Sequence, residues 1–185
     1  MITLGRAADP SHVLWSDEAL AARGIERVTT TRGGDVTWHG PGQLVAYPIV
    51  AVDHGVLAYV EAMARAVVDV AARLGIDAEF RRARPGVWVG AAKLCAFGVH
   101  VHRRVAIHGL ALNATASTQS FAPIVPCGLG DSSVCSIADL AGRSPPLPAL
   151  AALVAEALAS HLGRRLRPLV GEEIHSLLSP SAPLE

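Results

Sequence analysis

The feature that most constrains this chain is a glycine-rich stretch at residues 31–43, which reads TRGGDVTWHGPGQ. It holds four of the chain's 17 glycines between positions 33 and 42. Glycine reaches positive φ angles and lets another molecule approach the backbone closely. A short β-like run, Val36–Trp38, is followed by Gly40-Pro41-Gly42 and then by an apolar run at residues 44–50. We therefore expect a strand, a tight turn and a second strand, with bare backbone at both ends.

This stretch does not match the known phosphate-binding loops. It lacks the G-x-x-x-x-G-K-[ST] pattern, and it lacks G-x-G-x-x-G at the start of a helix because residues 43–50 are β-like. A phosphate site at a helix N-terminus is therefore not indicated. The residues alone leave two interpretations open: a surface for a flat or chain-like group, or a purely structural turn.

Length and composition indicate one folded domain without nucleic-acid, membrane or disulfide features. The chain has 185 residues, is 51% apolar and only 17% charged, which argues against disorder. Sixteen basic residues balance sixteen acidic ones, so no electrostatic case for nucleic acid exists. The first residues have no apolar core long enough for a signal peptide, so none is expected, and no run of about 18 apolar residues predicts a membrane span. Three cysteines are too few for a disulfide framework, and we expect a cytoplasmic protein with reduced thiols.

Apolar periodicity predicts a long helix at residues 56–74, ended by Gly75. Its opposite face carries the pairs Glu61–Arg65 and Asp69–Arg73 at the favourable i, i+4 spacing. Further helices are expected at residues 11–22, 148–162 and 172–178. Strands are expected at residues 2–4, 25–30, 78–81, 86–89, 94–102, 105–113 and 165–168, and a long loop at residues 114–126.

Two side chains stand out as candidates for chemistry. Cys127 lies in a loop between Pro126 and Gly128, the setting of a nucleophile, although a packing role is the alternative. Lys93 opens an apolar strand, where a lysine usually extends to water. If its ammonium met Cys127, it would lower the pKa of the thiol or take its proton as a base. By contrast, Cys95 and Cys135 lie in apolar runs and are expected to be buried packing residues.

The histidines and a short basic cluster leave alternatives open. His100 and His102 alternate on one strand, but no cysteine or carboxylate lies near them at ligand spacing, so no metal site is expected. His39 and His108 each precede a glycine in an apolar setting. The cluster at residues 81–84 (RRAR) is either a solvated turn or a docking point for an acidic partner.

Several motifs now stand in one order along the chain. They are Arg32-Gly33-Gly34 followed by Thr37-Trp38-His39-Gly40-Pro41-Gly42-Gln43, then Gly86-Val87-Trp88-Val89, Lys93, Gly98, His108-Gly109-Leu110-Ala111-Leu112-Asn113 and Pro126-Cys127-Gly128. In this order they closely resemble the octanoyltransferase family, also called lipoate-protein ligase B. The resemblance covers about residues 25–140. One departure is Trp38, which stands where the family usually has tyrosine.

The resemblance implies an α+β fold: a mixed β-sheet flanked by helices, as in the catalytic domain of biotin and lipoate protein ligases. It implies a single catalytic domain over residues 1–185, in which the first N-terminal strand and helix of the family are expected to be missing. It also implies Cys127 as the nucleophile and Lys93 as its base or pKa-lowering partner. The implied acyl pocket consists of Arg32, Gly33, Gly34, Asp35, Val36, Thr37, Trp38, His39, Ala96, Phe97, Gly98, Gly109, Leu110 and Ala111.

The implied reaction moves an octanoyl group from the phosphopantetheine thioester of acyl carrier protein to a lysine of a lipoyl domain. The acceptors would be the lipoyl domains of 2-oxoacid dehydrogenase complexes or the glycine cleavage H protein. No cofactor is expected, since a thioester is already activated. Two alternatives remain at this point: an ATP-dependent lipoate-protein ligase of the same fold, and an inactive truncated homologue that binds an acyl group or a carrier.

Overall fold

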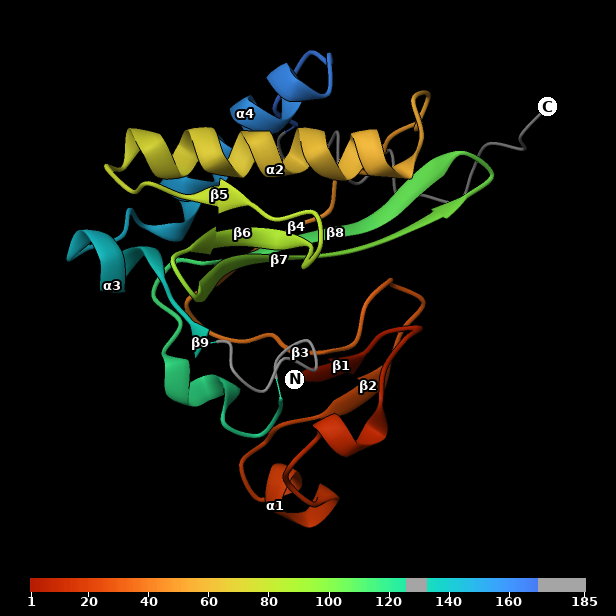
Figure 1. Cartoon of the computed structure of the whole chain (residues 1–185), viewed down its shortest axis with the longest axis vertical. Helices are drawn as coiled ribbons and strands as arrows, with labels where there is room; N and C mark the ends of the chain where they lie inside the picture. The colour runs from red at the N-terminus through yellow and green to blue at the C-terminus, as the bar shows by residue number, and fades with distance from the viewer. Residues whose placement is uncertain (126–132, 170–185) are drawn as a thin grey trace.

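The computed structural model describes residues 1–125 and 133–169, and two β-sheets form its framework (Figure 1). The smaller sheet has the order β2-β1-β3, with β1 (Ile2–Leu4) parallel to β2 (Arg27–Thr29) and antiparallel to β3 (Val36–Trp38). Strand β1 lies in the middle, where Ile2 and Thr3 are buried and Ile2 is fully shielded from solvent.

The larger sheet has six strands in the order β4-β8-β7-β6-β5, and β9 pairs in parallel with β7. The other pairings are antiparallel. The strands are β4 (Gln43–Ala46), β5 (Glu79–Phe80), β6 (Gly86–Val89), β7 (Ala92–His102), β8 (Val105–Asn113) and β9 (Ser133–Val134). Strand β6 pairs with β7 only as far as Ala96, so the C-terminal half of β7 extends beyond β6.

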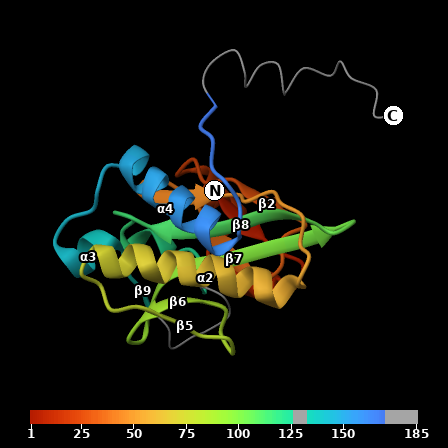
Figure 2. The same ribbon diagram turned by 90° about the horizontal axis from the view of Figure 1, so that it is seen from above.

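Two long helices, α2 (Val56–Arg73) and α4 (Leu147–His161), cover one face of the larger sheet (Figure 2). Their buried residues recur every three or four positions, as the periodicity of residues 56–74 predicts. Met63 of α2 and Leu150 of α4 are completely buried in the core between helices and sheet. None of the described helices is both long and apolar enough to cross a membrane.

A second apolar core stabilises the smaller sheet. There the Trp38 and Phe121 rings pack with their centroids 5.2 Å apart, beside the fully buried Ile2 and Leu20. The short helices α1 (Asp17–Ala21), η1 (Pro10–His12) and η2 (Thr118–Phe121) surround this sheet and its core. A further short helix, α3 (Ile137–Ala141), begins at Ser136 with a reciprocal capping box to Asp139.

The turn at residues 40–42 connects the two sheets. Strand β3, before the turn, pairs with β1, whereas β4, after it, pairs with β8. The predicted strand, turn and strand are therefore present, but the two strands do not pair with each other. Strand β4 ends at Ala46, earlier than the predicted residue 50, because Pro48 has no N–H to contribute to a ladder.

Most of the other predicted elements are confirmed to within one or two residues, but three further expectations about helices, strands and ion pairs are wrong. The predicted helix at residues 11–22 is only the five-residue α1, capped by the Ser16 side chain. Residues 165–168 form no strand. The predicted i, i+4 ion pairs of α2 do not form, because Glu61 instead binds Arg82 and Asp69 instead lies 2.7 Å from His161 Nε2. The predicted helix at residues 172–178 lies outside the described residues.

Candidate functional site

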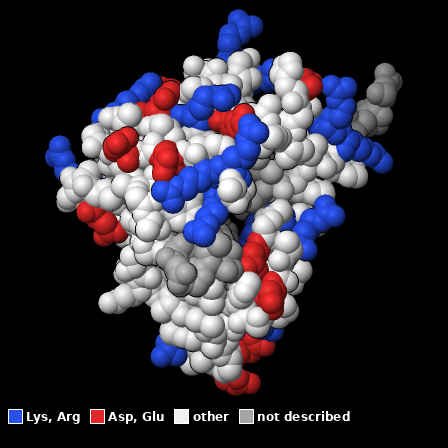
Figure 3. Space-filling view, viewed as in Figure 1, with Lys and Arg blue, Asp and Glu red and all other residues white. Residues whose placement is uncertain are grey.

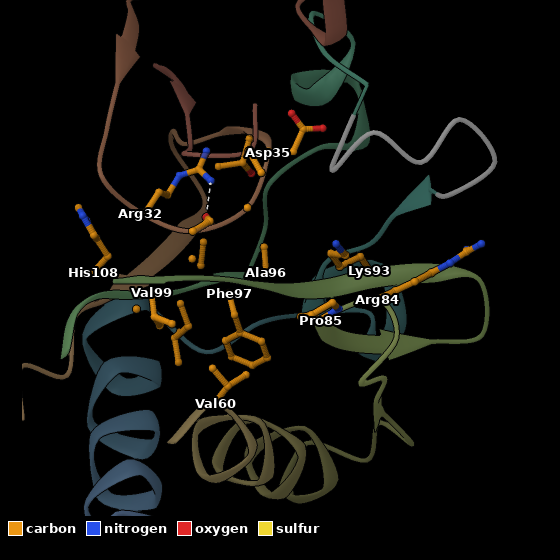
Figure 4. Close-up of a pocket in the computed structure, with 18 of the residues that line it drawn as sticks. Arg32, Asp35, Val60, Arg84, Pro85, Lys93, Ala96, Phe97, Val99 and His108 are labelled. Carbon is orange, nitrogen blue, oxygen red and sulfur yellow. Dashed lines mark hydrogen bonds between the residues drawn. The ribbon is translucent and has the colours of Figure 1, made fainter. Parts of the chain in front are cut away.

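A cavity of about 640 Å³ lies along β7, next to the glycine-rich loop (residues 31–35). Figure 4 shows Arg32 and Asp35 on one side of the β7 ribbon, and Phe97, Val99 and Val60 on the other. His108 lies toward one end of the cavity, and Lys93 lies with Arg84 and Pro85 toward the other. The cavity therefore extends along β7 from Lys93, which pairs with β6, to Val99, which lies beyond the end of β6.

The structure brings together nearly all the residues that the resemblance places in an acyl pocket. The lining includes Arg32, Gly33, Gly34, Asp35, Val36, Thr37, His39, Ala96, Phe97, Gly98, Gly109, Leu110 and Ala111. Trp38 is not among the lining residues, because its indole is buried against Phe121 in the core of the smaller sheet. Trp38 thus supports the cavity wall from behind.

The glycine-rich loop approaches β7 so closely that one of its residues must lack a side chain. The Gly33 N–H donates to the Val99 carbonyl oxygen at 2.9 Å, where the loop meets β7 beyond the end of β6. A Cβ atom on Gly33 would lie only 2.9 Å from that same oxygen. The next residue, Gly34, has a φ of 86°, a conformation that other residues rarely adopt. Backbone, rather than side chains, therefore forms this wall of the cavity.

Arg32 fastens the glycine-rich loop to the smaller sheet. Its guanidinium is buried and donates to Thr3 Oγ1 from Nε at 3.0 Å and to the Thr3 carbonyl oxygen from Nη2 at 2.5 Å. Its Nη1 donates to the Gly33 carbonyl oxygen at 3.1 Å, the bond drawn in Figure 4. A planar group with five donors suits this arrangement, in which one side chain joins a strand and a loop.

Lys93 is a buried lysine in the cavity wall, with only 6% of its surface exposed. Its Nζ lies 4.8 Å from the centroid of the fully buried Trp88 ring, a cation–π contact. The Trp88 indole is held in turn by donating to the Arg84 carbonyl oxygen at 3.0 Å. The expectation that a strand lysine extends to water is therefore wrong here, because the aromatic ring and the neighbouring strands enclose the ammonium.

Cys127, the predicted nucleophile, lies outside the described residues. The described chain resumes at Ser133, and β9 pairs Val134 with Lys93. The next residue, Cys135, donates its N–H to the Lys93 carbonyl oxygen at 3.0 Å. The chain that follows Cys127 in sequence is thus tied directly to the backbone of the buried lysine.

The other two cysteines are packing residues, as predicted. Cys95 is fully buried, and this burial raises the pKa of its thiol. Burial, with a smaller contribution from Asp139, raises the pKa of Cys135 to about 11. Both side chains therefore remain neutral thiols near neutral pH, which makes them poor nucleophiles.

His39 and His108 both line the cavity, and burial lowers the pKa of each. His108 has a φ of 61°, its Nε2 lies 3.0 Å from Thr31 Oγ1, and the Tyr47 ring meets it edge-on at 5.8 Å. His100 and His102 stack at 6.5 Å. Within residues 1–125 and 133–169, no three His, Cys, Asp or Glu side chains are grouped so as to hold a metal ion.

Sequence reasoning missed the lining that comes from distant elements. These residues are Ala7, Val45, Tyr47, Val56, Leu57, Val60, Phe80, Arg82, Ala83, Arg84, Pro85, Val99 and His108. They are mostly apolar, apart from His108 and two arginines that belong to the predicted basic cluster. The cavity can therefore hold an aliphatic chain along β7, with a buried lysine toward one end and arginines nearby.

Solved structures share this architecture. Lipoate-protein ligase A bound with ATP superposes with a TM-score of 0.76 at 15% identity, covering 95% of this chain and 74% of that one. The bipartite lipoate protein ligase of Thermoplasma acidophilum gives a TM-score of 0.73 at 16% identity, covering 95% and 73%. The biotin protein ligase of Aquifex aeolicus gives 0.54 at 12% identity, covering 87% and 68%. The fold is that of the biotin and lipoate protein ligase catalytic domain, as expected.

Sequence comparison narrows this class. Residues 1–159 match the lipoyl protein ligase A/B catalytic domain family. The octanoyltransferase of Chloroflexus aurantiacus is 48% identical over 168 residues, which cover 88% of this chain and 74% of the relative. That of Chromohalobacter salexigens is 38% identical over 172 residues, covering 91% and 76%. The chain therefore belongs to the octanoyltransferases of the lipoyl protein ligase family, which are transferase enzymes.

Proposed function

We propose that this protein moves an octanoyl group from octanoyl-acyl carrier protein to a lysine of a lipoyl domain, the first step of protein lipoylation. The observation that carries the proposal is the mostly apolar cavity along β7, with the buried Lys93 in its wall, in a chain of the octanoyltransferase family. Burying an aliphatic chain stabilises the complex by about 0.8 kcal/mol per CH₂ group. Most of the binding free energy of an eight-carbon chain would therefore come from burying its CH₂ groups.

The proposed chemistry has two steps. The Cys127 thiol loses its proton with the help of Lys93, and its sulfur attacks the donor thioester, so that one C–S bond forms and the carrier's C–S bond breaks. The acceptor amine then attacks the enzyme thioester, forming the C–N bond of an amide and releasing the thiol. Two bulky carrier proteins can thus use one site in turn. The tie between Lys93 and the chain that follows Cys127 supports this pairing.

The donor brings its own activated acyl group on phosphopantetheine, so the proposal includes no further cofactor. The fold relative from Thermoplasma acidophilum is described with its E2 lipoyl domain, which supports a lipoyl domain as the acceptor. The lipoyl domains of 2-oxoacid dehydrogenase complexes and the glycine cleavage H protein are the acceptors we propose. A cytoplasmic location is also a proposal, supported by the free thiols of Cys95 and Cys135.

Mass spectrometry of the protein mixed with octanoyl-acyl carrier protein tests the nucleophile. We expect one octanoyl mass on Cys127, which a lipoyl domain then removes. Cys127→Ser should abolish this thioester, whereas Cys135→Ser, a change at a buried thiol, is the matched control and should keep it. A Cys127→Ser protein that still forms the same acyl-enzyme would refute the assignment.

Lys93→Met tests the proposed partner of the thiol. Methionine keeps an apolar stem against Trp88 but removes the ammonium, so we expect acyl-enzyme formation to slow by about 100-fold or more without unfolding. Unchanged kinetics would remove Lys93 from the mechanism. Transfer that depends strictly on ATP and free lipoate would instead favour the ligase alternative, and octanoyl binding without turnover would favour an inactive homologue.

A further inference from the structure

A chain of buried hydrogen bonds leads from the cavity wall into the larger sheet. The Asn113 Nδ2 donates to the Cys135 carbonyl oxygen at 3.0 Å, and Asn113 Oδ1 accepts from Gln43 Nε2 at 2.9 Å. The Gln43 Oε1 then lies 2.7 Å from His39 Nδ1. Gln43 and Asn113 are 9% and 4% exposed, so water does not compete for these bonds.

The donor and acceptor of every hydrogen bond in this series follow from its last member, the Cys135 carbonyl oxygen. The Cys135 carbonyl oxygen can only accept, so the amide NH₂ of Asn113 must face it and its Oδ1 must face Gln43. Gln43 must therefore present its NH₂ group to Asn113 and its Oε1 to the imidazole. An amide oxygen can only accept, so the Nδ1 of His39 carries the hydrogen. In the neutral ring, the lone pair is then on Nε2.

That nitrogen is open to the cavity. His39 lines it, and among residues 1–125 and 133–169 its Nε2 has no hydrogen-bond partner. Since no buried side-chain nitrogen or oxygen of the described residues lacks a partner, Nε2 is not enclosed by protein. Burial lowers the pKa of His39, and the hydrogen bond to Gln43 opposes this effect only in part. The positive charges of the nearby Arg32 and the N-terminal ammonium lower the pKa further. The ring is therefore held neutral, with a free acceptor on a residue that lines the cavity.

We propose that His39 Nε2 accepts the proton that the acceptor lysine must lose, and that Gln43 and Asn113 are positioning residues that fix this tautomer. The inference rests on the proposed function. The acceptor ammonium gives one proton to Nε2, and its freed electron pair attacks the thioester carbonyl. The C–N bond forms, the C–S bond breaks with its electron pair on sulfur, and the second amine proton goes to the thiolate. The imidazolium then releases its proton to solvent.

The first experiment separates the two half-reactions. His39→Gln keeps a polar side chain of similar length but removes the titrating lone pair, so transfer to the lipoyl domain should fall about 100-fold more than acyl-enzyme formation does. The pH profile of this transfer should also lose its histidine limb. Gln43→Met should also slow transfer to the lipoyl domain relative to acyl-enzyme formation, and weaken the histidine limb of the pH profile, but by a smaller factor. His102→Gln, at the exposed end of β7, is the matched control and should leave both unchanged.

A purely structural role gives a different result. In that case His39→Gln and Gln43→Met would slow both half-reactions equally and leave the shape of the pH profile intact, which would overturn the proposal while octanoyl transfer by the protein still stands. If no acyl-enzyme forms even in the wild-type protein, the proposed function fails instead. The two failures are therefore distinguishable.

A second measurement does not depend on activity. Nitrogen-15 NMR of the His39 imidazole should show the Nδ1–H tautomer in the wild-type protein. Gln43→Met should shift the ring toward the Nε2–H tautomer, which free imidazole side chains favour. An Nε2–H tautomer in the wild-type protein, or an unchanged Nδ1–H tautomer in Gln43→Met, would refute the positioning role.

Discussion

Individual residues differ in how they can be used to probe the cavity. Gly34 sits at a φ of 86°, so any larger residue there strains the backbone besides narrowing the space. Ala96 is a better probe. It lies on β7, lines the cavity and pairs with Ala111 on β8 within a regular ladder, where a larger side chain fits the backbone.

Ala96→Leu should weaken binding of the octanoyl donor. The added carbons displace about two CH₂ groups of the acyl chain, which corresponds to about a tenfold rise in KM. Butanoyl donors, which are shorter, should be affected less. Steady-state kinetics with both donors measures the difference, and Ala152→Leu on the exposed side of α4 is the control. Equal effects on both donors would show that Ala96 does not border the acyl chain.

At the scale of elements, the Arg32 side chain is a polar tie between β1 and the glycine-rich loop. Its planar guanidinium donates to the hydroxyl and carbonyl oxygens of Thr3 at the same time, a geometry that a lysine cannot reproduce. Arg32→Lys should lower the free energy of unfolding by about 1.5–3 kcal/mol, the range for charged hydrogen bonds. It should also speed hydrogen exchange of the β1 amides.

The matched control lies in the same sheet. Arg27→Lys changes an exposed ion pair to Asp17, where such pairs contribute at most about 1 kcal/mol. Urea unfolding of both variants measures the contrast. Equal, small shifts of the unfolding midpoint would mean that the loop is held by its backbone hydrogen bonds, such as Gly33 to Val99 and Ala7 to Gly34, and not by the guanidinium.

At the scale of the whole molecule, stability should peak between about pH 7 and 9. Burial lowers the pKa of His39 and His108 in the folded protein. Below the ordinary histidine pKa of 6.5, both side chains therefore take up protons more readily in the unfolded chain, so stability falls as pH decreases. Above the ordinary thiol pKa of 9.0, Cys95 and Cys135 ionise only when unfolded, so stability falls as pH rises. Urea midpoints across pH measure this, and Cys135→Ala should flatten the alkaline slope.

An arginine near Lys93 is expected to contact the phosphopantetheine arm of the donor. Phosphopantetheine carries a phosphate, and the exposed Arg84 borders the cavity near Lys93 (Figure 4). In the space-filling view, basic side chains gather near the middle of this face (Figure 3). Arg82 is already paired with Glu61, so Arg84 is the better candidate for a phosphate contact.

Arg84→Ala should raise the KM for octanoyl-acyl carrier protein by about tenfold, the magnitude of one charged hydrogen bond. A small octanoyl thioester without phosphate should show no such change. The effect should also shrink at high salt, because salt screens exposed charges. An equal KM increase for both donors would place Arg84 at the acyl chain rather than at the carrier arm.

The sequence by itself determined the elements and the order of the motifs. Local rules suffice there: the apolar period of α2, the glycine after it and the β-like runs of β6 and β8 depend on neighbours within a few positions. The thiols of Cys95 and Cys135 were also predictable as buried, because apolar residues flank them.

The tertiary structure alone decided what surrounds the cavity. Residues of the glycine-rich loop, α2, β5 and β8 meet along β7 although they lie far apart in sequence, and no local pattern encodes such a meeting. It also decided that the turn at residues 40–42 joins two sheets, that Lys93 lies over Trp88, and that Gln43 and Asn113 orient His39. The physical reason is that strand pairing and burial are long-range: they depend on which surfaces pack together, and the sequence states only which surfaces are apolar.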